Sequence, residues 1–203
     1  MKKPVSFVVA LAVCLIVMNV TTFQVAAQKQ PPRLRFADNL DGTITDTWTG
    51  LMWEKKTGSV GAGILCSDLY TCPDPSDVNN LYVWSATGSA ADGPLFTDFL
   101  AKMNCSVSTD GTCGAGPYTD WRVPTLAELR TIVTPNCSVP PCINPIFGPT
   151  QRDYWSSTTS ANPTSDSPVE NNAWDVDFFN GTQGDDWKTQ NFGNHVRAVR
   201  RGR

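Results

Sequence analysis

Two aspartates and one histidine are the residues of this chain best suited to acid–base chemistry. Asp175 and Asp177 alternate in an apolar stretch, which predicts a strand with both carboxylates on one face and roughly 7 Å between their Cα atoms. Such a pair could hold a metal or exchange protons. His195 is the only histidine, and the sequence contains no GxSxG nucleophile motif. Because an enzyme needs a nucleophile with its base, an acid–base pair or a metal, we expect no catalytic residues and a structural role for all three.

The cysteines predict disulfides rather than a metal site. Seven are present; one lies in an apolar N-terminal run, and the other six fall in three close couples, each within a loop rich in Pro, Gly, Ser or Asn. An even number of cysteines suits an oxidising compartment. Zinc is disfavoured because there is no CxxC motif and only one histidine. The predicted disulfides, each closing one local loop, are Cys66–Cys72, Cys105–Cys113 and Cys137–Cys142.

One tryptophan lies among polar residues, in one of two stretches, 159–172 and 180–194, that we predict to be polar loops. An aromatic ring among polar side chains can stack on a sugar or anchor a protein interface. The candidate ligand-binding residues are Asn171, Asn172, Asp185, Asp186, Trp187 and Asn191. Five other tryptophans lie in strand contexts, where large aromatics usually pack in the core: Trp48, Trp53, Trp121, Trp155 and Trp174.

The segment 38–42 can be interpreted as a tight turn or as a calcium loop. With Gly42 at the turn position of a calcium loop, Ala37 and Trp48 occupy the places of its first and last acidic ligands, which favours the turn. Calcium is the one cofactor that the sequence leaves open, and no metal ligands are assigned.

The N-terminus has the pattern of a signal peptide. Lys2 and Lys3 precede an apolar run from Val5 to Val20 that ends in small residues near Ala27. At about sixteen residues the run is shorter than the roughly 20 that span a bilayer. A lipoprotein signal ending at Cys14 is the alternative. We expect a signal peptide at 1–27, a flexible segment at 28–32 and a domain at 33–203, with no transmembrane anchor after cleavage and an extracytoplasmic location, periplasmic or secreted.

The charge of the chain argues against nucleic acid as a partner. Loss of the leader lowers the net charge from -3 to about -5, and acidic chains bind nucleic acids poorly. The C-terminal arginines Arg197, Arg200, Arg201 and Arg203 could favour a sulfated or phosphorylated partner locally, or form a solvated terminal strand. The sequence gives no oligomeric state.

Periodicity predicts an α+β domain of short strands, two helices and long loops. Apolar spacing indicates a helix over 95–103, and Thr125 with Glu128 indicates a capping box that starts a second helix. Strands are expected at 33–38, 43–47, 51–54, 154–158, 173–179 and 195–200.

Several blocks resemble the Lcl C-terminal domain family of bacteria, in order from about Arg33 to Arg200. They are Asp41-Gly42-Thr43 with Asp46 and Thr49-Gly50-Leu51-Met52-Trp53; Asp120-Trp121-Arg122-Val123-Pro124-Thr125 with Glu128-Leu129; Tyr154-Trp155-Ser156-Ser157-Thr158; Ala173-Trp174-Asp175-Val176-Asp177-Phe178 with Gly181; and Val196-Arg197-Ala198-Val199-Arg200. The closing block departs from the family pattern at Ala198, where a cysteine often stands. The resemblance implies a C-type-lectin-like fold, in which the terminal strands pair and long loops lie on one side.

This resemblance favours one function: a secreted, non-catalytic module that binds a carbohydrate or surface ligand, as an adhesin does. One family member forms the end of a collagen-like adhesin that binds sulfated glycans, but this chain has no Gly-X-Y tract. The alternatives are a structural or protein-interaction domain, including a diversified lectin-like variable protein, and an enzyme related to formylglycine-generating enzymes. Cys137 and Cys142 have the spacing of that enzyme's redox pair, without the surrounding motif.

Overall fold

A computed structural model describes residues 34–68, 70–107, 114–161 and 171–202 of the chain. The chain divides into two units, 1–33 and 34–203, and everything described lies in the second. The predicted signal peptide and flexible segment lie outside the described residues. None of the helices in the described part is long and apolar enough to cross a membrane.

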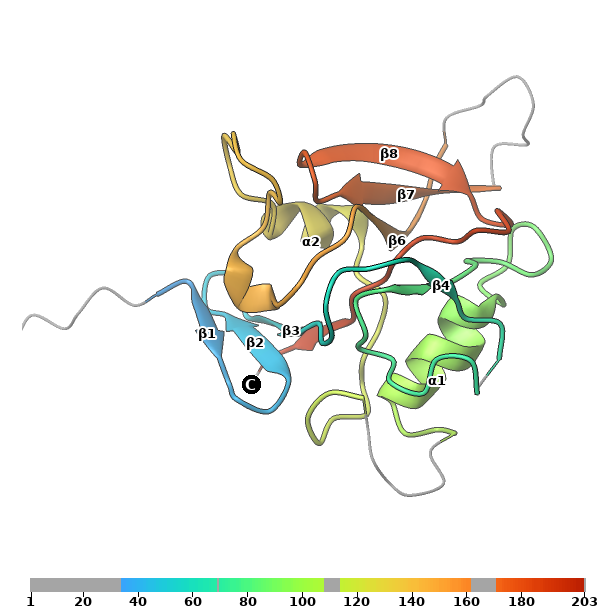
Figure 1. Ribbon diagram of the computed structural model, residues 1–203, viewed down its shortest axis with the longest axis horizontal. Helices are drawn as coiled ribbons and strands as arrows, with labels where there is room; N and C mark the ends of the chain where they lie inside the picture. The colour runs from blue at the N-terminus through green and yellow to red at the C-terminus, as the bar shows by residue number, and fades with distance from the viewer. Residues whose placement is uncertain (1–33, 69, 108–113, 162–170, 203) are drawn as a thin grey trace, which may run out of the picture. The chain divides into compact units, whose positions relative to one another are not determined.

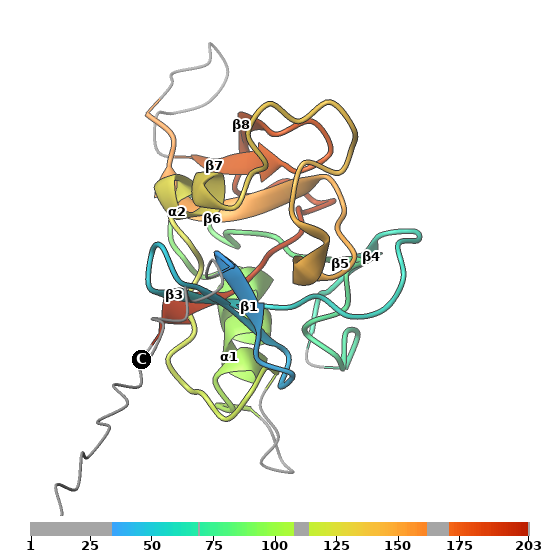
Figure 2. The ribbon, with the colours of Figure 1, turned by 90° about the vertical axis from the view of Figure 1, so that its left-hand side faces the viewer.

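The first sheet has four strands in the order β1-β2-β3-β9 and joins the two ends of the domain (Figures 1 and 2). Its strands are β1 (Phe36–Asp38), β2 (Thr43–Asp46), β3 (Leu51–Glu54) and β9 (Val199–Arg201), all antiparallel. The turn between β1 and β2 is the predicted one: Gly42 has a φ of 84°, and the Asp41 carboxylate accepts the Thr43 N–H at 3.1 Å. The hairpin prediction is confirmed.

The second sheet has three antiparallel strands, β6 (Asp153–Thr159), β7 (Asn172–Asp177) and β8 (Thr182–Trp187). The prediction of a polar loop over 180–194 is wrong, since β8 pairs with β7 along its whole length. The reason is that an edge strand can keep polar side chains while β7 supplies its backbone hydrogen bonds. A short parallel pair, β4 (Ile64–Leu65) and β5 (Asn80–Leu81), was also missed.

Both predicted helices are present but short. The first is a π-helical segment η1 (Leu95–Phe99) continued by α1 (Leu100–Met103), and the second is α2 (Leu126–Thr131). Thr125 caps α2 as expected: its side chain accepts the Glu128 N–H, and the Glu128 side chain accepts the Thr125 N–H. A 3-10 helix, η2 (Pro145–Phe147), lies beside β1. The α+β class is confirmed.

Two apolar clusters hold the domain together. One lies between α2, η2 and the sheets, and includes Trp53, Leu129, Phe147 and Tyr154; Figure 1 shows α2 against β6 and β7. The other packs around η1 and α1 and includes Trp84, Phe99, Trp121 and Trp155. Of the five tryptophans expected in the core, Trp53, Trp121 and Trp155 are fully or almost fully buried and Trp174 is partly buried, but Trp48 is 76% exposed.

Candidate ligand-binding site

Trp187 is the last residue of β8, at one end of the β7–β8 hairpin, and is 50% exposed. Its partner across the strands is Asn172, whose Nδ2 lies 3.4 Å from the Asp185 carboxylate, to which it donates. Because alternate residues of a strand share a face, Asp185 and Trp187 point to the same side. The structure therefore brings three of the six predicted contact residues together. We call Asn172, Asp185 and Trp187 the Trp187 group.

A buried lysine fixes the position of the Trp187 group. Lys188 is 2% exposed; its Nζ donates to Thr159 Oγ1 at 2.9 Å and lies 4.3 Å from the centre of the Trp84 ring. Its backbone N–H donates to the Asn171 carbonyl at 2.7 Å, which continues the pairing of β7 and β8. Since Lys188 is held inward, the neighbouring indole of Trp187 is directed outward.

The remaining predicted contact residues are placed differently. Asp186 lies on the opposite face of β8 from Trp187, where its carboxylate accepts a hydrogen bond from Asn194 at 2.9 Å. Asn171 is partly buried beside the end of β8, and Asn191 is exposed in the loop that follows. The structure therefore separates Asp186 from the Trp187 group.

Asp175 has a strongly raised pKa. Asp175 and Asp177 share one face of β7, as predicted, and Asp153 and Asp186 stand on the neighbouring strands. Burial, and then the charges of Asp186 and Asp153, raise the pKa of Asp175 to about 7. The Asp177 carboxylate accepts a hydrogen bond from the Phe179 N–H at 2.7 Å. Among the residues that the structure describes, no three His, Cys, Asp or Glu side chains form a group suited to a metal ion.

His195 connects elements of the interior. It is 9% exposed, and its Nδ1 lies 2.9 Å from the Asn80 carbonyl oxygen, to which it can donate. Its backbone bonds to Asp153 and Trp155 extend the second sheet beyond β6. Burial lowers the pKa of His195 to about 4, so the ring is neutral at physiological pH.

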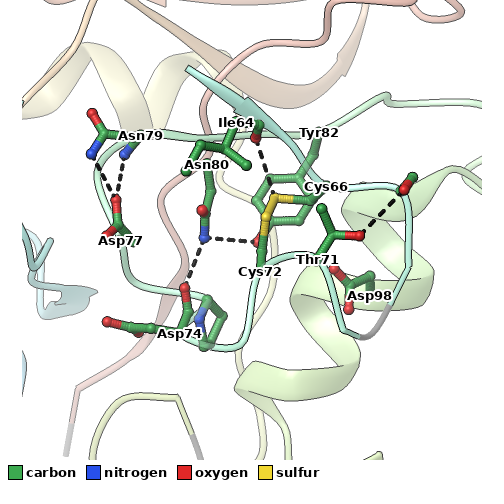
Figure 3. Close-up of a disulfide and its surroundings, with 12 residues drawn as sticks. Ile64, Cys66, Thr71, Cys72, Asp74, Asp77, Asn79, Asn80, Tyr82 and Asp98 are labelled. Atoms are coloured by element: carbon green, nitrogen blue, oxygen red, sulfur yellow. Dashed lines mark hydrogen bonds between the residues drawn. A yellow bond between two sulfur atoms is a disulfide. The ribbon is translucent and has the colours of Figure 1, made fainter. Parts of the chain in front are cut away.

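Two of the three predicted disulfides are confirmed, Cys66–Cys72 and Cys137–Cys142. The first lies against the buried ring of Tyr82, next to Asn80 (Figure 3). The predicted Cys105–Cys113 pairing involves Cys113, which lies outside the described residues. The paired cysteines are six and five positions apart in the sequence, so each bond fixes one local bend.

The sequence analysis missed the exposure of Trp48 and the strand that carries Trp187. The dipeptide Asn180-Gly181 at the β7–β8 turn is a strong hairpin signal that indicates this strand, and Gly181 has the positive φ, 77°, that the turn requires. Trp48 lies on the turn between β2 and β3, beneath the Arg35 guanidinium at 4.9 Å from the ring centre. Two of the C-terminal arginines, Arg197 and Arg200, are buried rather than solvated.

The fold and the Trp187 group define a small, disulfide-stapled α+β domain with a half-exposed aromatic residue at a strand end. A family model described as the Lcl C-terminal domain matches residues 42–200, and the chain belongs to this family. Searches of curated proteins and of solved structures returned no match.

Proposed function

We propose that the protein is an exported, non-catalytic binding module with a C-type-lectin-like fold that recognises a saccharide on a surface through the Trp187 group. The observation that carries this proposal is the half-exposed indole of Trp187, fixed beside Asp185 and Asn172. A flat aromatic face can stack on the apolar face of a sugar ring, while nearby amide and carboxylate groups bind its hydroxyls.

The arrangement of strands supports the lectin-like part of the proposal. The N-terminal strands β1 to β3 and the C-terminal strand β9 form one sheet, while β6 to β8 form a second. Disulfides persist in oxidising compartments, so Cys66–Cys72 and Cys137–Cys142, together with the leader pattern, support an extracytoplasmic location.

The state of the acid–base residues supports a role without catalysis. A general base has to reach its substrate in the correct protonation state. His195 and Asp175 are 9% and 4% exposed, His195 is hydrogen-bonded to a backbone carbonyl, and Asp177 is bound by the backbone of Phe179.

A glycan array, run with calcium and with EDTA, tests the proposal on the wild-type protein and two variants. Trp187→Ala should lose binding to the neutral glycans that the wild type selects. Phe179→Ala is the matched control, because Phe179 is 47% exposed and follows β7 at the opposite end of the same hairpin. Equal binding of neutral glycans by the wild type and Trp187→Ala would refute the site. A wild-type protein that binds no glycan would refute saccharide recognition and favour the structural or protein-interaction role.

A further inference from the structure

A pocket of about 520 Å³ lies between α2 and the β3–β9 side of the first sheet. Its lining includes Thr49, Arg122, Glu128, Thr131 and Arg201, and none of the Trp187 group. Small-molecule sites measure about 300–1,000 Å³, so this pocket has the size of a ligand site.

Arg122 is held rigidly at this pocket. Its backbone exchanges two hydrogen bonds with Val199 of β9: the Arg122 N–H donates to the Val199 carbonyl at 3.0 Å, and the Val199 N–H donates to the Arg122 carbonyl at 2.9 Å. Its guanidinium donates from Nη1 and Nη2 to the two carboxylate oxygens of Glu128, at 2.7 and 2.6 Å. A guanidinium has five N–H donors, so this pairing offsets the charge of Arg122 while leaving N–H groups to bind a ligand.

Arg201 supplies a positive charge that is not offset. It lies two residues after Val199, so it shares a face of the sheet with Arg122. Its side chain is exposed, and it forms no ion pair or side-chain hydrogen bond with the part of the chain that the structure describes. Arg122, Glu128 and Arg201 together therefore give the pocket lining a net charge of one positive unit.

Trp48 directly precedes Thr49, a lining residue of the same pocket. The Arg35 guanidinium above the Trp48 ring donates to the carbonyl of a second lining residue, Thr131, at 2.7 Å. The charge of Arg35 is offset by Asp46, at 2.8 Å. The indole is 76% exposed, which leaves a flat apolar surface free next to Thr49 in the chain.

We infer that this pocket is a second binding site, for a saccharide residue that carries a single carboxylate, as a uronic acid does. The carboxylate pairs with Arg201, the hydroxyls accept hydrogen bonds from Arg122, and the sugar ring lies against Trp48. The single excess charge matches one carboxylate; a polysulfated chain carries more negative charge than the pocket can offset. The inference goes beyond the proposed function, because the two sites share no residue.

Isothermal titration of the full chain with the methyl glycoside of galacturonic acid, which carries a single carboxylate, and with the neutral methyl ester of that compound, tests this inference. The wild type should bind the acid, and its affinity for the ester should be lower by about tenfold or more. This is the loss expected for one charge-assisted hydrogen bond. Arg201→Gln should weaken binding of the acid by a similar factor, and Arg201→Lys should retain part of it. Trp48→Ala should weaken binding of both compounds.

Two controls separate this site from the Trp187 group. Arg130→Gln removes an exposed arginine of α2 that lines a different hollow, and should bind as the wild type does. Trp187→Ala should also bind the acid normally. Equal affinity for acid and ester, no loss in Arg201→Gln, tighter binding of a sulfated oligosaccharide that lacks carboxylates, or loss in Trp187→Ala alone would each overturn the inference. Only the last of these would assign the binding to the Trp187 group; the first three do not bear on that group, which the glycan array tests separately.

Discussion

Arg197 donates from Nη1 to the carbonyl oxygen of Glu54 at 2.8 Å, although 143 residues separate them and both side chains are fully buried. The Glu54 carboxylate also pairs with Lys56 Nζ at 2.6 Å and accepts the Ala198 N–H at 2.8 Å. Burial lowers the pKa of Lys56, and the charge of Glu54 opposes this effect. Glu54, at the end of β3, therefore contacts two buried cations in different ways: its carboxylate pairs with Lys56, and its backbone carbonyl accepts from Arg197.

Replacing Glu54 should destabilise the domain strongly. Glu54→Ala leaves Lys56 buried without its anionic partner, a change that costs about 3–5 kcal/mol of unfolding free energy. Urea denaturation measures it. Lys55→Ala is the control, since the pair of Lys55 with Asp38 is partly exposed and contributes about 0–1 kcal/mol. Similar losses in the two variants would show that Glu54 does not balance the buried charge of Lys56.

Thr125 should contribute measurably through the capping box of α2. Thr125→Ala removes the acceptor for the Glu128 N–H and should lower the unfolding free energy by about 1 kcal/mol. Thr134→Ala, at an exposed position three residues after α2, should change it by less than about 0.5 kcal/mol. Thermal and urea denaturation of both variants would detect the difference, and equal stabilities would contradict the capping role.

Asp175 should make the fold less stable as the pH rises. Its pKa is about 7 in the folded protein against 3.8 for the free side chain, so between these values the unfolded chain has already lost the proton that the fold retains. Rising pH therefore favours unfolding until about pH 7. Asp175→Asn, which cannot ionise, should gain stability relative to the wild type between pH 4 and pH 7. Denaturation curves at both ends of this range measure the change, and a constant difference would contradict it.

His195 should act in the opposite direction. Its pKa is about 4 in the fold against 6.5 for the free side chain, so its neutral form contributes stability above pH 6.5 that is lost as the pH falls toward 4. Relative to the wild type, His195→Gln should lose less stability on acidification. The difference between the two unfolding free energies, followed from pH 7 to pH 4, tests this. A larger acid loss in the variant would refute it.

The two disulfides should differ in their effect on stability. Closing such short loops contributes about 2 kcal/mol each by the chain-entropy estimate. Cys66 and Cys72 are both buried in an apolar cluster, whereas Cys137 is partly exposed. The double variant Cys66→Ala/Cys72→Ala should therefore lose more unfolding free energy than Cys137→Ala/Cys142→Ala, because it also disturbs packing. Guanidinium denaturation compares them, and the reverse order would contradict this assignment.

Much of the candidate site depends on partners that are distant in the sequence. Asp185 and Trp187 could be selected from composition. That they share one face of β8 while Asp186 points to the opposite face follows from the pairing of β8 with β7. The elevated pKa of Asp175 arises from Asp153 and Asp186, which belong to two other strands. Alternation within β7 alone indicated only Asp177 as its neighbour.

The sequence alone was sufficient to predict caps, turns and disulfides between residues that are close in the chain. The capping box at Thr125, the turn at Gly42 and the pairing of Cys66 with Cys72 each involve residues a few positions apart, so residue type and spacing were sufficient to predict them. Only the tertiary structure decided which large or charged side chains are covered. Trp48 and Trp53 are five residues apart on the same β-hairpin, yet one is exposed and the other fully buried. Burial depends on which distant segment packs over a residue, and Trp53 is covered by η2 and β9, which come much later in the chain.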